Sequence, residues 1–274
     1  FVACTGSSAL LLQQTADLAR RMTVVKVFPF KFHEYLDARQ RLSEGKDTGW
    51  NQASSDKLKQ ALFYAQNIDD SRLLLESIKP QVSAYLPSKG LVEKQDIEKA
   101  ITEYITSQNI PAFMYYKDVS DIYSGIQTLV KRVIFEDVAK LVTSPANHLE
   151  IERLAIRLAG SDEVNLQKLA GIIGMKREQI ESNIDLMCKA ELLNVLLPYT
   201  GIDGKLNKNR KAFFMSPSIR AALLAVFYGT ELPTQFLSKL YEDTVVMYLK
   251  STLTDGVLSF TSMANSSNPD FVVE

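Results

Sequence analysis

The sequence is poor in the residues that build metal centres and disulfide frameworks. It has two cysteines, Cys4 and Cys188, and two histidines, His33 and His148. Both cysteines fall in apolar segments, so we expect free, buried thiols in a reducing compartment. Two isolated histidines make no metal site. There is also no run of eighteen apolar residues and no basic-then-apolar leader. We therefore expect a soluble, cytoplasmic protein with no membrane partner.

Neither sign of charge dominates. The 274 residues include 31 Lys and Arg and 32 Asp and Glu, which gives a formal net charge of −1. This balance argues against a dominant basic surface for nucleic acid, although a local basic patch remains open. Hydrophobic residues make up 46% and charged residues 23%, an ordinary globular composition. The length is sufficient for two or three small domains.

The first thirty-five residues carry most of the chemistry that the sequence suggests. Residues 1–4 form a short apolar strand, which the polar turn TGSS at residues 5–8 ends. A helix follows and closes on Arg20-Arg21, and residues 22–28 form a second strand, ended by Pro29. Ligands of parallel α/β sheets lie outside the carboxyl ends of the strands. We therefore expect the TGSS turn to lie at a ligand-binding edge.

This order of TGSS, ADLARR, strand and FPFKFHEYL resembles the end of the nucleotide-binding core of prokaryotic AAA-like P-loop ATPases. The resemblance implies that Thr5 and Ser7 sense the γ-phosphate of ATP. It also implies that Arg21 offsets phosphate charge, so that these three residues are both catalytic and cofactor-binding. Arg20-Arg21 stands where the family usually has Gly-Arg.

The sequence has no phosphate loop of the GxxxxGK[ST] type, and no apolar strand ending in acidic residues precedes Phe1. We therefore expect a fragment whose N-terminal part, carrying the phosphate loop, lies upstream. ATP and Mg²⁺ are expected only for the intact protein, and we expect no ATP hydrolysis by this chain alone.

Helical patterns fill residues 31–141. One helix covers residues 31–44, a second begins with N-cap residues at Ser54 and Ser55, and a turn falls at residues 87–90. We interpret this region as a helical lid with a solvated outer surface, in which Trp50 caps the helical layer. A well-buried helix with apolar residues at helical spacing is then predicted from Ile122 to Leu141.

Residues 148–199 have the order helix, helix, tight turn, helix, strand, which is the plan of a winged helix-turn-helix. Leu149, Leu154, Ala155 and Leu158 are predicted to face inward on the first helix. A DNA-binding role would use basic and amide side chains of the third helix and of the loop after the strand: Lys176, Arg177, Gln179, Lys208 and Arg210. Glu178, Glu181 and Asp185 on the same outer face would repel the negatively charged phosphates of DNA. A solvated loop and an interdomain structural unit are the simpler interpretations.

The C-terminal segment resembles the start of a restriction-endonuclease-like domain in the same family. The helix LSKLYEDTVVMYLK carries Glu242, and the strand PDFVVE carries Asp270. The resemblance implies that both carboxylates are metal ligands, because phosphodiester cleavage uses a carboxylate-held divalent cation. The strand with an E-x-K motif that would complete the site does not occur, so structural carboxylates are the simpler interpretation.

The predicted fold is mainly α with some α/β. The predicted domains are the end of the AAA-like core with its parallel sheet (1–45), the helical lid (46–141), the winged helix (142–205) and the start of the nuclease-like α/β domain (206–274). Three functions remain open: a nucleotide-driven switch, a DNA-binding winged-helix regulator, and a structural module that docks on a protein partner.

Overall fold

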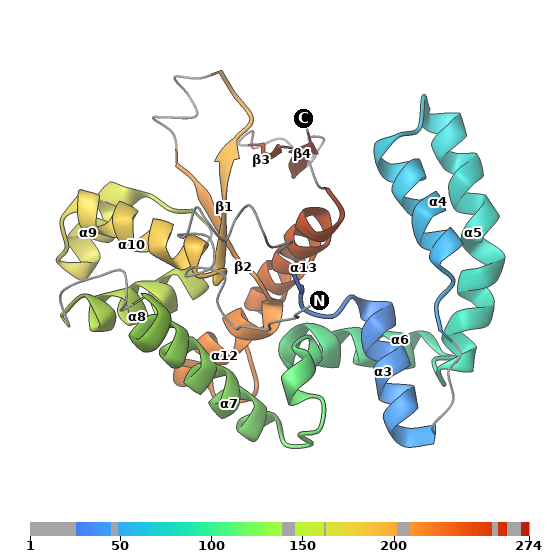
Figure 1. Ribbon diagram of the computed structural model, residues 1–274, viewed down its shortest axis with the longest axis horizontal. Coiled ribbons are helices and arrows are strands. Elements are labelled where there is room, and N and C mark those ends of the chain that lie inside the picture. Colours follow the sequence, from blue (N-terminus) through green and yellow to red (C-terminus); the bar gives the residue numbers. More distant parts are fainter. Residues whose placement is uncertain are drawn as a thin grey trace, which may run out of the picture. The chain divides into compact units, whose positions relative to one another are not determined.

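The computed structural model describes residues 26–44, 49–138, 146–161, 163–201, 209–253, 257–261 and 270–273. This part of the chain is mainly helical and contains one small sheet of four strands (Figure 1). The prediction of a mainly α fold with some α/β is confirmed at that level. None of the helices described combines the length and apolarity needed to cross a bilayer.

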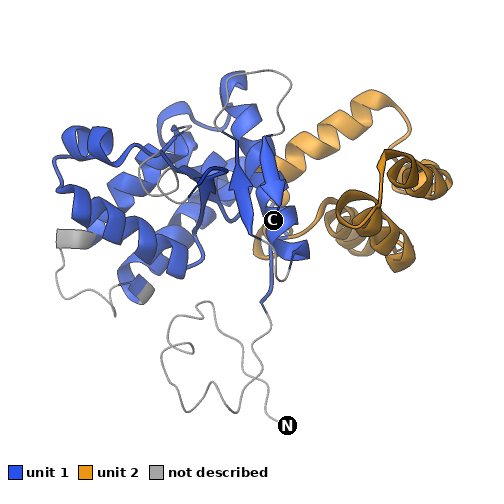
Figure 2. Cartoon of the chain, turned by 90° about the horizontal axis from the view of Figure 1, so that it is seen from above, with its two compact units in different colours: residues 1–29, 115–274 blue, residues 30–114 orange. Residues whose placement is uncertain are grey.

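The chain divides into two compact units (Figure 2). Unit 2 comprises residues 30–114, and unit 1 comprises residues 1–29 together with 115–274. The predicted domain boundaries at residues 45, 141 and 205 come from sequence motifs and not from compactness, and they stay a prediction. Residues 26–28, the described end of the predicted second strand, lie outside any helix or strand.

Unit 2 is built from helices. They are α3 (Phe32–Glu44), α4 (Gln52–Phe63), α5 (Ile68–Ser88), α6 (Lys94–Glu103), the π-helical turn η1 (Tyr104–Gln108) and the 3₁₀ turn η2 (Pro111–Phe113). Asparagines fix the starts of two of them, since Asn51 Oδ1 accepts from Ala53 N at 2.9 Å and Asn67 Oδ1 accepts from Asp70 N at 2.9 Å. The predicted N-cap at Ser54 and Ser55 is therefore wrong, and Ser54 is instead buried inside α4.

The first described helix of unit 1 is α7 (Val119–Arg132), which continues as the π-helical turn η3 (Val133–Asp137). Ile122, Ile126 and Val130 recur at helical spacing on its buried face, and Ile134 and Val138 extend that face, as predicted. The side chain of Gln127 donates to the carbonyl of Ala222 at 2.7 Å, which ties α7 to α12 (Pro217–Tyr228). The other helices among the described residues of unit 1 are α8 (Ala146–Ala159), α9 (Leu166–Ile173), α10 (Arg177–Lys189), the 3₁₀ turn η5 (Thr234–Phe236) and α13 (Leu237–Thr252).

A tight turn joins α9 to α10. Helix α9 ends at Gly174, whose φ of 78° lies in the left-handed region that glycine adopts without a Cβ penalty. Strand β1 (Leu193–Pro198) follows α10 and pairs antiparallel with β2 (Lys211–Phe214). An isolated bridge between Val164 and Arg210 extends β2 toward the start of α9. Residues 148–199 thus have the predicted element order of helix, helix, tight turn, helix and strand. We call residues 146–214, which add β2, the helix–hairpin module.

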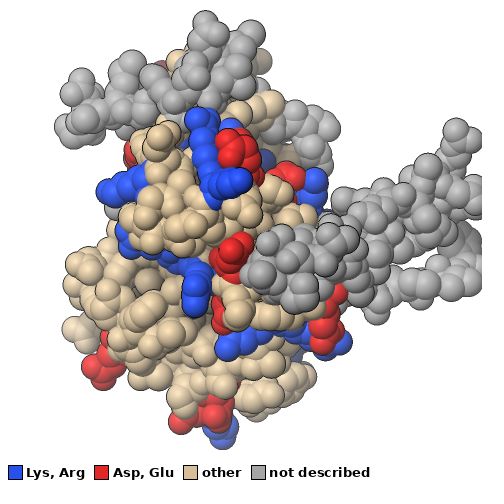
Figure 3. All heavy atoms as spheres, turned by 90° about the vertical axis from the view of Figure 1, so that its left-hand side faces the viewer, with Lys and Arg blue, Asp and Glu red and all other residues tan. Residues whose placement is uncertain are grey.

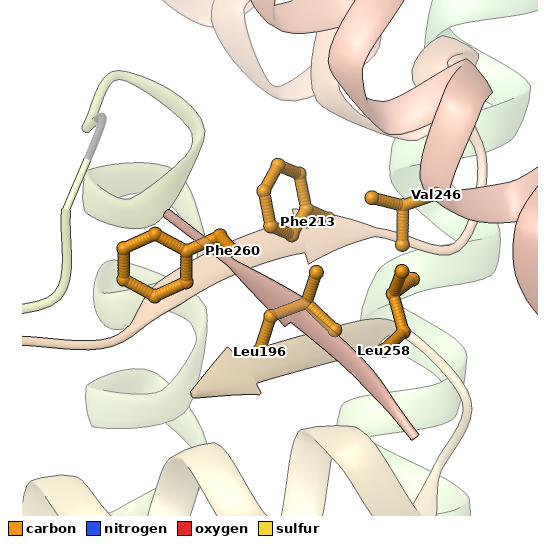
Figure 4. Close-up of a cluster of buried hydrophobic side chains, with 5 residues drawn as sticks. All are labelled: Leu196, Phe213, Val246, Leu258 and Phe260. Carbon is orange, nitrogen blue, oxygen red and sulfur yellow. The ribbon is translucent and has the colours of Figure 1, made fainter. Parts of the chain in front are cut away.

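The sheet has the order β2-β1-β3-β4. Strand β3 (Leu258–Phe260) runs parallel to β1, and β4 (Phe271–Val273) runs antiparallel to β3. One core lies where these strands meet α13. Figure 4 shows its five side chains pointing toward one another: Leu196 from β1, Phe213 from β2, Val246 from α13, and Leu258 and Phe260 from β3.

Candidate functional site

The three residues predicted to sense nucleotide, Thr5, Ser7 and Arg21, lie outside the described residues. Their roles therefore stay predictions. The site that can be built from described residues is the outer face of α10 with the adjoining β1–β2 hairpin, which is the predicted nucleic-acid interface. Lys208 of that prediction also lies outside the described residues.

The first turn of α10 presents the predicted polar side chains together. Lys176, Arg177 and Gln179 are all exposed. The side chain of Gln179 accepts from the backbone N–H of Lys176 at 3.1 Å, so its carbonyl oxygen serves as a helix cap. Its amide group remains a donor. Lys176 and Arg177 therefore supply the positive charge at this end of the helix.

Arg210 is held by the same helix. Its guanidinium donates to Glu181 Oε1 at 2.7 Å, and both side chains are partly exposed. This contact joins the start of β2 to the middle of α10. One of the five predicted DNA contacts is thus already paired with a carboxylate, and phosphate would have to compete with Glu181 for it.

Acidic side chains follow the basic ones along α10. Glu178, Glu181 and Asp185 are spaced by three and four residues and therefore share one face of the helix. Asp185 is paired with Lys189 at 2.6 Å. On the face in Figure 3, which is the left-hand side of Figure 1, basic and acidic side chains are interspersed. The surface is mixed in charge, which lowers the electrostatic attraction that a phosphate backbone would feel.

A cavity of about 340 Å³ lies between α10 and the hairpin. It is lined by Glu181, Asp185, Cys188 and Arg210, with Val195 contributed by β1. Burial, followed by the negative charge of Asp185, raises the pKa of Cys188 to about 11. The thiol is therefore protonated at neutral pH, which fits the predicted free thiol better than a nucleophile, although Cys188 is half-buried and not fully buried as predicted.

The two predicted metal ligands occupy different elements. Glu242 lies on α13, where Lys211 Nζ approaches it to 3.8 Å, and Asp270 immediately precedes β4. Lys211 Nζ also lies over the ring of Phe260, 5.4 Å from its centroid. Cation–π contacts form within about 6 Å of the ring centroid. Within the described ranges, no three His, Cys, Asp or Glu side chains gather as a metal site would require. The arrangement fits an ion-paired Glu242.

Unit 2 contains a polar network that the sequence did not reveal. Lys89 Nζ lies 2.6 Å from Asp37 Oδ1, and the side chains are 2% and 16% exposed. Tyr85 donates to the same carboxylate at 2.8 Å, and the backbone N–H of Trp50 donates to it at 3.1 Å. Burial opposes the charge on Asp37, yet hydrogen bonds from Lys89, Trp50 and Tyr85 hold its pKa below the usual value. Trp50 packs edge-on against Tyr85, with ring centroids 5.1 Å apart.

Beside this network lies a cavity of about 300 Å³, formed by residues of α3, α6 and the end of α5. Its lining mixes basic Arg39 and Lys99 with acidic Glu44, Asp96 and Glu103. Several of these groups already have partners: Arg39 donates to Glu103 at 3.0 Å, and Asp96 accepts from the backbone N–H of Glu93 at 3.1 Å. The cavity therefore shows no excess of one charge that would select a ligand.

A second buried ion pair, also missed from the sequence, lies in unit 1. Arg220 of α12 and Asp243 of α13 are 2% and 0% exposed, and the guanidinium donates to both carboxylate oxygens, at 2.6 and 2.8 Å. The available signal was a single arginine in the apolar run SIRAALLAV, since arginine is seldom buried without a partner. No local pattern indicated which carboxylate would pair with it.

Comparison of the sequence with known proteins gives a match to one family model and a match to one curated protein. A family model described as "Domain of unknown function (DUF8612)" matches residues 94–229, from the start of α6 to the end of α12. The chain is also 25% identical over 252 residues to "Uncharacterized protein MJ1637" of Methanocaldococcus jannaschii. That alignment covers 91% of this chain and 48% of the relative, so the chain spans about half of the relative's length. No solved structure matches.

Proposed function

We propose that this chain is part of a prokaryotic AAA-like ATP-binding protein that works as a nucleotide-driven switch. The observation that carries the proposal is the order of sequence motifs in residues 1–35: TGSS, a predicted helix ending in Arg20-Arg21, a predicted strand and FPFKFHEYL. In this function Thr5 and Ser7 sense the terminal phosphate, and Arg21 offsets its charge. ATP and Mg²⁺ are bound together with a phosphate loop that belongs to the intact protein.

The segment that follows the predicted strand supports this proposal. Lys31 N donates to the carboxylate of Glu34 at 2.7 Å, which fixes the first turn of α3. Tyr35, one residue further, is buried, and its hydroxyl accepts from Arg39 at 3.0 Å. The FPFKFHEYL motif thus starts a helix whose base is anchored inside unit 2. A helical unit in this position is the expected partner of a nucleotide-binding core.

The test is ATP binding and hydrolysis by the full-length protein of which these residues are part. Arg21→Ala is expected to lower kcat by about 10³-fold or more, the usual scale for an arginine acting on transferred phosphate. Arg20→Ala is the matched control, because Arg20 stands where the family usually has glycine, and we expect its rate to stay within about twofold of the wild type. Full-length protein that binds no ATP at millimolar concentration would remove the proposal.

A second function is favoured by the exposed Lys176, Arg177 and Gln179 on α10. For it we propose that residues 146–214 form a winged helix-turn-helix that binds duplex DNA, with α10 as the recognition helix and Lys208 and Arg210 in the wing. The affinity should fall steeply with salt, and Arg177→Ala should make the slope of log K against log[salt] shallower by about 0.9. Lys189→Ala, which removes a cation already paired with Asp185, is the control. Absence of any gel shift at low salt would end this second candidate.

A further inference from the structure

We infer that the helix–hairpin module (146–214) and the C-terminal elements α12, α13 and β3 form one rigid, cooperatively folded body that is held together by the buried contacts of Arg220. The sequence divides these elements between two domains at residue 205. The inference concerns only described residues of unit 1 and does not depend on the proposed ATP binding. It rests on a buried cluster and on the pairing of the sheet, which are independent of each other.

The buried cluster uses every donor of one guanidinium. Arg220 Nε and Nη2 donate to the two oxygens of Asp243, at 2.6 and 2.8 Å. Nη2 also donates to the carbonyl of Ala212 at 3.1 Å, and Nη1 donates to the carbonyls of Ala159 at 2.9 Å and Leu158 at 3.3 Å. An arginine carries five N–H donors in a rigid fork, so all five have an acceptor here.

Those acceptors belong to different elements. Leu158 and Ala159 end α8, Ala212 lies in β2, and Asp243 lies in α13, whereas Arg220 itself comes from α12. The cation thus also meets the negative end of the α8 dipole. Asp243 is held in turn, because the backbone N–H of Phe214 donates to its Oδ1 at 2.9 Å.

Displacing any one of these elements would leave a buried charge or carbonyl without its partner. Burial raises the pKa of Asp243, while the charge of Arg220 and the hydrogen bonds from Arg220 and Phe214 oppose that rise. The carboxylate therefore depends on the guanidinium for its charge, and the guanidinium depends on the carboxylate. A cluster of this kind has a strong preference for a single arrangement of the four elements.

The sheet provides the second connection. Strand β3 pairs with β1 at Leu197 and Pro198, and the backbone N–H of Tyr199, just past β1, donates to the carbonyl of Phe260 at 2.7 Å. The core in Figure 4 draws its residues from β1, β2, β3 and α13. The hairpin is therefore bound to the C-terminal elements at the point where its connecting loop begins.

One consequence concerns whatever binds the outer face of α10. The hairpin is fixed to α10 by Arg210 and Glu181 and to α13 by the sheet and the Arg220 cluster. A ligand of this face meets a preformed surface, so binding needs no internal rearrangement of the body. A force or displacement applied to one element of this body is therefore transmitted to all its elements together.

Native-state hydrogen exchange on the wild-type chain, followed at rising concentrations of denaturant, tests the inference. We expect slow amides in α8, β1, β2, α12, α13 and β3, including the Phe214 amide of β2 that donates to Asp243, to merge into one opening reaction with a common denaturant dependence. Amides of α13 and β3 that exchange through a separate opening, with a smaller denaturant dependence than those of β1, would overturn it.

Two matched variants complete the test. Arg220→Lys keeps the positive charge and loses the fork, so protection should fall by a similar factor in all four joined elements. Arg153→Lys makes the same exchange at an exposed position of α8 and should leave protection unchanged. A loss of protection confined to α12 in Arg220→Lys would contradict a shared body. If Arg220→Lys fails to fold, the wild-type measurement decides by itself.

Discussion

Asp37→Asn should destabilise unit 2 far more than an ordinary surface substitution. The variant keeps the shape of the side chain and leaves Lys89, whose side chain is 2% exposed, with a buried charge and no carboxylate. Lys89 Nζ retains Gln40 Oε1 as an acceptor, 2.5 Å away, but an amide oxygen does not neutralise an ammonium.

Breaking a buried pair by removing one partner costs about 3–5 kcal/mol. Asp37 is 16% exposed, so water screens part of the interaction, and we expect a loss of about 3 kcal/mol, at the lower end of that range. The double variant Asp37→Leu with Lys89→Met removes both charges and should be less destabilised than Asp37→Asn alone. Lys94→Met breaks an exposed pair with Glu98 and should cost less than about 0.5 kcal/mol.

Trp50 provides the assay. It is the single tryptophan of the chain, its backbone N–H donates to Asp37, and its ring packs on Tyr85. Urea unfolding followed by tryptophan fluorescence therefore reports on this network. The reasoning fails if Asp37→Asn and Lys94→Met shift the free energy of unfolding equally, or if the double variant is as unstable as the sum of its single variants.

The same network has a defined dependence on pH. The pKa of Asp37 is lower in the folded protein than its usual value, so the folded state favours the ionised form. Its contribution is complete above the unfolded-state pKa of about 3.9 and is lost as the pH falls through the lower folded value. Wild-type stability monitored at Trp50 should be insensitive to Asp37 between neutral pH and about pH 5. The difference between wild type and Asp37→Asn should shrink in more acidic solution.

Three further outcomes are expected. Asp243→Asn should destabilise unit 1 by about 3–5 kcal/mol, because it leaves the fully buried Arg220 without a counter-charge. Circular dichroism during urea unfolding measures this loss. The control Glu242→Gln, on the same helix, should cost under about 1 kcal/mol. Gly174→Ala should cost about 1–2 kcal/mol by the same measurement, because its φ of 78° is unfavourable for alanine. No atom lies within 4 Å of the added Cβ, so backbone strain is the whole effect. A neutral result would show that the α9–α10 turn relaxes. In a Cys4→Ser background, Cys188 should react with iodoacetamide at pH 8 far more slowly than free cysteine does. Its reactivity should rise only toward pH 11. Rapid labelling at pH 8 would contradict the raised pKa.

Local patterns predicted the helices well. The apolar spacing from Ile122 to Val138 and the glycine that ends α9 both act through neighbouring residues, and the structure has the helix and the turn where the sequence indicated them. Leu149 was predicted to face inward but is 56% exposed. The buried stripe of α8 is Ile151, Leu154, Ala155 and Leu158, so strict use of the helical period would have selected Ile151 in its place.

Contacts between distant segments could not be predicted. Asp37 lies on α3 and Lys89 directly follows α5, and nothing in their local sequence marks them as partners. The parallel pairing of β1 with β3 involves only two residue pairs, too few for a pattern of alternation to set the register. For the candidate site, Lys176, Arg177 and Gln179 do share the first turn of α10, while the pairing of Arg210 with Glu181 emerged only from the fold. Thr5, Ser7 and Arg21 stay predictions.

The pairing of β1 with β3 also bears on how the protein is made. Leu197 and its partner Ser259 are separated by about sixty residues, so the loop between them must be closed before this contact forms. A ribosome adds about 5–20 residues per second, which leaves the outer edge of β1 uncovered for several seconds after it emerges. During that interval the strand can pair with another chain. Newly synthesised copies should accordingly be most prone to aggregation, and most dependent on chaperones, before β3 leaves the ribosome.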